Sequence, residues 1–136
     1  LGLPGAGRPQ RRAMANHTPL EWCFRRHQCL DCPGGWPEPA ALAWLAEHGV
    51  RHLLVDLPSV DPEEDGGALA AHRAFWGLPL GSQSASEARY PGASITELIQ
   101  VPTDCVEGRY KLNLSLAPMQ GDAVPSRPML FSAEQF

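Results

Sequence analysis

Residues 37–58 read PEPAALAWLAEHGVRHLLVDLP, and this stretch predicts the fold class. The two prolines at its start suit the first turn of a helix, where a backbone N–H is not needed. Alanine and leucine, both strong helix formers, dominate residues 40–46, and Gly49 is typical of the left-handed residue that ends a helix. The apolar run at 50–57 then predicts a buried strand. A helix, a glycine turn and an apolar strand in succession predict an α/β fold.

The larger side chains of this region are expected to pack inside the protein. One face of the predicted helix carries residues at helical spacing, namely Ala41, Trp44, Leu45 and His48. Four aromatic residues are expected in the core rather than on a surface that stacks a ligand: Trp44, Phe75, Trp76 and Tyr110. His48 and His52 flank the turn after the helix, where a structural role is expected because the helix dipole favours histidine there.

Short elements separated by polar loops follow the first strand. Residues 67–76 predict a second helix, and residues 82–94 predict a surface loop. Three more strands are expected, at residues 94–101, 110–116 and 128–131, and the middle one alternates strictly. Residues 1–36 show no period and predict an irregular lead, whereas residues 37–136 predict one domain. The fold class is therefore expected to be α/β, with a mixed sheet and flanking helices.

Composition and charge exclude several classes of partner. The 136 residues carry a net charge of −4, which argues against a nucleic-acid partner because phosphate binding needs a basic surface. No apolar run approaches the roughly 18 residues that cross a bilayer, so no membrane partner is expected. No secretory signal is visible, from which we expect a cytoplasmic protein with reduced cysteines. The first residue is Leu rather than Met, from which we expect an incomplete chain.

Polar side chains that could do chemistry follow the predicted elements. Asp56 ends the first strand, and Ser59 and Asp61 lie in the loop after it. His72 lies in the second helix and Glu97 in the next strand. Because functional groups collect at the carboxyl ends of strands, these side chains could form a metal site or an acid–base site. The spacing by itself favours an arrangement in which Asp56 and Ser59 cap the loop, His72 is half-exposed on an amphipathic helix and Glu97 is an outward residue of an edge strand.

Several separated motifs occur in a fixed order along the chain. They are a Gly-Val turn at 49–50, Asp-x-Pro-Ser-x-Asp at 56–61, a His-Arg helix at 71–75 and Ile-x-Glu-Leu at 95–98. Gly-Arg-Tyr-Lys-Leu at 108–112, Ala-Pro at 117–118 and Ser-Arg-Pro at 126–128 follow. In this order the motifs resemble the second half of the cyclase family, which includes bacterial kynurenine formamidase and isatin hydrolase. The resemblance spans residues 37–131.

The resemblance implies both a fold and a site. The fold would be a swivelling β/β/α domain, and the family's homodimer would be expected. His72 and Glu97 would be metal ligands, and an imidazole with a carboxylate suits Zn²⁺ or Mn²⁺. Asp56, Ser59 and Asp61 would shape the site.

The resemblance also implies an activity. The protein would be a metal-dependent hydrolase of a C–N bond in a small-molecule amide or cyclic amide. N-formylkynurenine, an intermediate of tryptophan catabolism, is the leading substrate.

One part of the family's pattern has no counterpart here. The family's first half carries His-x-Gly-Thr-His-x-Asp-x-Pro, which supplies further metal ligands. Residues 16–19, Asn-His-Thr-Pro, are the only candidate and lack the second His and the Asp. Because catalytic zinc usually has three protein ligands, the chain by itself would lack a complete site. The alternative is a non-catalytic remnant of the family that acts as a structural or dimerisation module, and catalytic residues stay unassigned.

Two other stretches of the sequence contain side chains of the kinds that bind metals. Cys23, His27, Cys29 and Cys32 form C-x3-H-x-C-x2-C, which could bind a structural zinc. The same residues also fit an irregular segment with free thiols, because no second knuckle follows. The acidic loop at 61–65 lacks the ligand order of an EF-hand, so calcium is not expected there.

Overall fold

The computed structural model of the protein describes residues 21–24 and 35–132. In chain order the elements are β1 (Glu21–Phe24), α1 (Pro39–Glu47), β2 (His52–Leu54), α2 (Ala70–Trp76), a 3₁₀ turn η1 (Ala85–Glu87), β3 (Ser94–Thr96), β4 (Gly108–Leu116) and β5 (Ser126–Ser132). Within these described residues no helix is long and apolar enough to cross a membrane.

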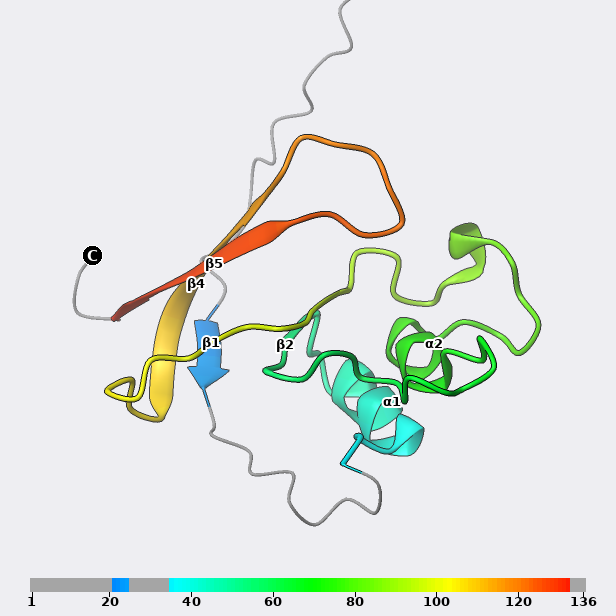
Figure 1. The fold of residues 1–136 in the computed structure, drawn as a ribbon, viewed down its shortest axis with the longest axis horizontal. Coiled ribbons are helices and arrows are strands. Elements are labelled where there is room, and N and C mark those ends of the chain that lie inside the picture. The colour runs from blue at the N-terminus through cyan, green and yellow to red at the C-terminus, as the bar shows by residue number, and fades with distance from the viewer. Residues whose placement is uncertain (1–20, 25–34, 133–136) are drawn as a thin grey trace, which may run out of the picture.

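Strands pair in two separate small sheets. β1, β4 and β5 form an antiparallel sheet in that order, and β2 pairs with β3 in parallel. Figure 1 shows the antiparallel sheet on one side of the molecule and the parallel pair with both helices on the other. Helices combined with parallel and antiparallel pairing agree with the predicted mixed α/β content. The two kinds of pairing do not share one sheet in this part of the chain.

Helix α1 begins and ends as its sequence predicts. Pro39 occupies the first helical position, where its fixed φ suits the helix. Gly49 has a φ of +93° and its N–H donates to the carbonyl of Ala46 at 3.2 Å. The N–H of Val50 donates to the carbonyl of Leu45 at 3.0 Å, which completes a Schellman motif. The glycine therefore reverses the chain and leads it directly into β2.

The core forms where the two helices meet. Its buried members are Leu42, Ala46, Val60, Ala71 and Phe75. Ala46 and Ala71 have small side chains, which let helices approach closely. Trp76 packs partly buried against this cluster and Tyr110 is half-buried, so the predicted burial of Phe75 is complete and that of the other two is partial.

The predicted inner face of α1 is only partly right, because Leu45 packs against the core whereas Ala41, Trp44 and His48 are exposed. Trp44 is 56% exposed and stacks on His48 with the ring centroids 3.9 Å apart. The helix instead buries Leu42 and Ala46. Trp44 is two residues from each of them, or about 200° around the helix. Helical spacing alone predicted one face of α1 as buried, but packing against α2 buries a different face.

The four strands that follow α1 have bounds that differ from the predictions. β2 covers only the middle of residues 50–57, and β3 covers only the start of residues 94–101. Leu98 has a left-handed φ of +56°, which turns the chain away and leaves Glu97 just beyond β3 rather than inside it. β4 and β5 are longer than predicted, because the start of β4 pairs with β1 and both ends of β5 pair with β4.

Candidate functional site

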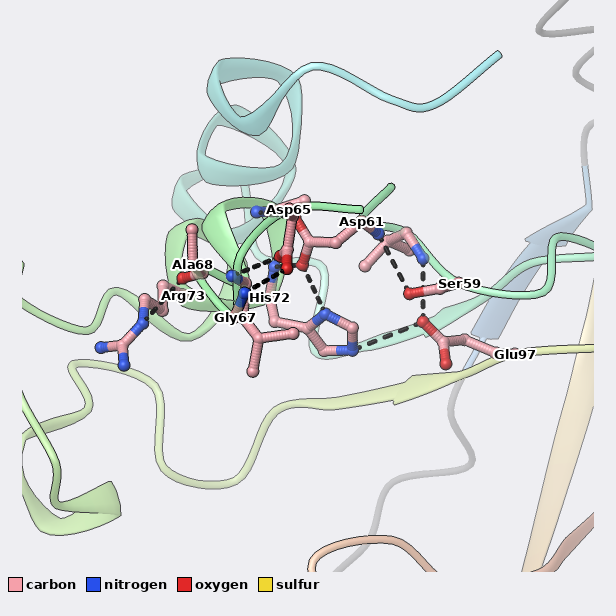
Figure 2. A network of polar contacts seen from close by, with 11 residues as sticks. Ser59, Asp61, Asp65, Gly67, Ala68, His72, Arg73 and Glu97 are labelled. Carbon is pink, nitrogen blue, oxygen red and sulfur yellow. Dashed lines mark hydrogen bonds and ion pairs between the residues drawn. The ribbon is translucent and has the colours of Figure 1, made fainter. Parts of the chain in front are cut away.

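The parallel strands place two loops side by side. Asp61 lies in the segment after β2, and Glu97 directly follows β3. Because β2 and β3 run in the same direction, the residues that follow them lie at the same edge of the pair. His72, in the first turn of α2, lies between these two carboxylates (Figure 2). The structure therefore brings together three of the five predicted site residues.

Asp61 is the buried anchor of the site. It is only 2% exposed, and its Oδ1 accepts a hydrogen bond from the N–H of Ala71 at 2.6 Å. Leu69, the N-cap of α2, has no side-chain oxygen to accept the first N–H groups of the helix. The carboxylate of Asp61, ten residues earlier, takes over this capping role. Its position is thus fixed by the helix it caps.

His72 is held by the same carboxylate. Oδ2 of Asp61 accepts from the backbone N–H of His72 at 3.1 Å and lies 2.7 Å from the ring Nδ1. Burial raises the pKa of Asp61, but the hydrogen bonds from Ala71 and His72 outweigh it and leave the pKa below its usual value. The carboxylate is therefore ionised and accepts only, so Nδ1 must carry the hydrogen. A neutral His72 then has its lone pair on Nε2.

Glu97 faces that lone pair. Its Oε1 lies 3.4 Å from Nε2 of His72 and also accepts a hydrogen bond from the N–H of Val60 at 2.8 Å. Two acceptor atoms face each other here, so either a proton or a cation must lie between them. The distance exceeds an ordinary N–H···O hydrogen bond. Two ligand atoms of one tetrahedral zinc, each at about 2.1 Å, would be about 3.4 Å apart.

The donor atoms of His72 and Glu97, the distance between them and the hydrogen bond that orients His72 therefore all suit a metal ion. A metal-bound histidine commonly donates its second ring N–H to a carboxylate, as His72 does to Asp61. The side chains of His72 and Glu97 are 16% and 27% exposed, so an ion could enter from solvent. Within residues 21–24 and 35–132, however, no group of three or more His, Cys, Asp or Glu is arranged to hold a metal.

The other predicted residues have supporting positions. Ser59 shapes the loop, because its Oγ accepts from the N–H of Asp61 at 3.1 Å. Asp56 is exposed and belongs to none of the contacts that join Asp61, His72 and Glu97. His27, Cys29 and Cys32 lie outside the described residues, as does the Asn-His-Thr-Pro stretch at 16–19.

Asp65 was missed by the sequence reasoning. Its two carboxylate oxygens accept from the N–H groups of Gly67 and Leu69 at 2.7 and 2.6 Å, and Figure 2 shows it beside the start of α2. The signal was present, because an aspartate two residues before a glycine favours a local side-chain turn. Asp65 holds the loop that leads into the helix of His72.

Backbone strain flanks the pair on both sides. Leu69, the N-cap of the His72 helix, and Leu98, directly after Glu97, have φ values of +48° and +56°. They are the only non-glycine residues with positive φ in the part of the chain that the structure describes. Leucine in this conformation is costly, and such strain clusters at functional sites. Both left-handed residues set the direction of the element that carries a candidate ligand.

Comparisons with known proteins found no relative of this chain. No protein-family model matches the sequence, and neither a curated protein nor a solved structure matches the chain.

Proposed function

We propose that His72 and Glu97 bind one Zn²⁺ or Mn²⁺ ion in a metal-dependent hydrolase that cleaves the C–N bond of an amide or cyclic amide. The observation that supports this is the 3.4 Å approach of Nε2 to Oε1, with Nδ1 of the same ring on buried Asp61. The sequence resemblance adds three expectations to this proposal: the cyclase-type swivelling fold, a homodimer, and N-formylkynurenine as the leading substrate. A cytoplasmic location is proposed as well.

Each residue has a distinct part in this proposal. Asp61 holds the imidazole so that Nε2 points toward Glu97, and the ionised Asp61 strengthens that nitrogen as a ligand. Glu97 contributes the second donor, and the N–H of Val60 keeps its carboxylate in place. A bound metal of this kind supplies a water with a pKa near 7 and polarises a substrate carbonyl. The amide carbonyl would therefore have to lie beside His72 and Glu97.

Two protein donors are one fewer than catalytic zinc usually has. The third would come from residues outside the described ranges or from a second chain. If no third donor joins the pair, the alternative function is a non-catalytic structural or dimerisation module. The absence of a third donor among residues 21–24 and 35–132 is the observation that favours this alternative.

A zinc titration of the purified chain tests the ligand pair. Cys23, Cys29 and Cys32 are first replaced by serine, because these thiols could bind zinc independently. In this background we expect His72→Ala and Glu97→Ala each to weaken zinc binding at least about tenfold. His48→Ala and Glu63→Ala are matched controls, since both residues are exposed, and their affinity should not change. Equal affinity in all four variants would discard the pair as ligands.

Turnover separates the enzyme from the structural module. Hydrolysis of N-formylkynurenine is followed by the absorbance of the kynurenine that forms, with zinc or manganese added. Metal-dependent turnover that both His72→Ala and Glu97→Ala abolish supports the hydrolase. Zinc binding without turnover supports the module.

A further inference from the structure

A cavity that is open to solvent lies beside α2, where the helix carries Leu69, Arg73 and Trp76. Its volume is about 480 Å³, which falls within the range of small-molecule sites, about 300–1,000 Å³. It is bounded by α2, by the loop after α2 and by the connection between β4 and β5, which reaches toward that loop in Figure 1. The residues that define its chemistry are Arg73, Trp76, Leu78, Ser82, Tyr90 and Asp122.

Two aromatic residues, Trp76 and Tyr90, contribute to the lining of the cavity. Trp76 is half-buried, and the centroid of its ring lies 5.3 Å from that of His72. The guanidinium groups of Arg51 and Arg89 lie 4.5 and 5.3 Å from the centroid of the Tyr90 ring. These contacts restrict both side chains before any ligand arrives, which lowers the entropy lost on binding. Aromatic side chains in the lining favour a planar aromatic ligand.

Arg73 provides the only positive charge in the lining of this cavity. Its Nε donates to the carbonyl of Ala68 at 3.1 Å, and its Nη1 donates to the carbonyl of Ser82 at 2.9 Å. These two bonds fix the plane of the guanidinium between α2 and the following loop. A guanidinium stays protonated in proteins and matches the geometry of a carboxylate. The cavity therefore combines aromatic walls with a positioned anion-binding group.

We propose that this cavity binds a planar aromatic carboxylate, with its ring against Trp76 and Tyr90 and its carboxylate on Arg73. Asp122 is exposed and is the one acidic residue of the lining. It repels a purely anionic ligand through a screened, partly solvated interaction. The proposal goes beyond the metal-dependent hydrolase and does not need it. Binding is tested with chelator present, so failure of one proposal is distinguishable from failure of the other.

The test compares naphthalene-2-carboxylate with naphthalene-2-carboxamide, which share a ring system and differ in charge. Each is titrated into the full chain while the indole N–H signals of the four tryptophans are followed by NMR. Trp76→Phe identifies the signal of Trp76. We expect that signal to shift, and the carboxylate to bind about tenfold more tightly than the amide.

Two variants locate the charge recognition. Arg73→Gln should abolish the preference for the carboxylate. Asp122→Asn should tighten carboxylate binding about twofold and leave the amide unchanged, because it removes a nearby like charge. Since Arg73 also ties two segments together, Asp122→Asn keeps the test valid if Arg73→Gln does not fold. Equal affinity of carboxylate and amide, an unmoved Trp76 signal, or an unchanged ratio in Asp122→Asn would each overturn the proposal.

Discussion

One carboxylate oxygen of Asp61 contacts His72 twice, at the backbone N–H and at the ring Nδ1, at 3.1 and 2.7 Å. The same residue therefore caps α2 and sets the orientation of the imidazole on that helix. Stability and site geometry are coupled through a single buried side chain. Removal of the Asp61 carboxylate should therefore lower the stability of the protein and also disturb the geometry of the site.

Asp61→Asn should destabilise the protein by about 2–3 kcal/mol. The amide keeps the shape of the carboxylate but replaces one acceptor oxygen by an NH₂ donor, which then faces the N–H of either Ala71 or His72. The free energy of unfolding is measured with urea. Asp56→Asn is the matched control, because Asp56 is exposed and its change should stay within about 0.5 kcal/mol. Equal losses in the two variants would contradict the capping role.

The pH dependence of stability should carry the signature of Asp61. Its pKa is lowered in the folded protein, so the unfolded chain binds the proton more tightly. The stabilisation is fully present above the unfolded pKa, about 3.9, and is lost as the pH falls through the lower folded value. The unfolding free energy should therefore decline below about pH 4 more steeply in the original protein than in Asp61→Asn. Parallel urea-unfolding profiles from pH 2 to pH 6 would count against this.

Zinc binding by His72 and Glu97 should weaken in acid. Protons compete with a metal for its ligand atoms, so the affinity of a histidine–carboxylate site falls in acid. Competition with a zinc-binding dye should show weaker binding at pH 5 than at pH 8. An affinity that does not vary with pH would show that the ion binds elsewhere.

Gly49→Ala should destabilise the protein by about 1–2 kcal/mol, because position 49 is left-handed with φ of +93°. A Cβ there would meet no atom within 4 Å. The loss of stability would therefore come from the backbone conformation and not from a steric clash. Gly92→Ala is the control, since a Cβ at Gly92 also meets nothing and its φ is not in the left-handed region. The change at position 92 should stay within about 0.5 kcal/mol.

Truncation of Phe75 should lower the free energy of unfolding far more than truncation of Trp44. Phe75 is fully buried between the helices, whereas Trp44 is 56% exposed. Phe75→Ala should lower the unfolding free energy by about 3–5 kcal/mol. Trp44→Ala should lower it by less than about 1 kcal/mol, because only its stacking on His48 is lost. A larger loss for Trp44 would restore the helix face that the spacing first predicted.

Local chemistry in the sequence determined much of the fold. The proline entry and glycine exit of α1 and the existence of strand β4 depend on a few neighbouring residues, and the structure confirms them. Burial along β4 alternates only over residues 112–115. Such features can be predicted because a backbone conformation or a hydrogen-bonded ring involves only residues adjacent in the chain. The ends of β2 and β3 could not be placed, because the left-handed turn at Leu98 has no signal in its own residue type.

The tertiary structure decided which distant residues come into contact. The sequence predicted His72 and Glu97 as partners only through a resemblance, and it left Asp61 as a residue that shapes the site. The parallel register of β2 and β3 and the docking of α2 bring the three together, across eleven positions from Asp61 to His72 and twenty-five from His72 to Glu97. The same docking buried Leu42 in place of Trp44. Contacts between distant residues depend on how elements pack, and the period of one element does not contain that information.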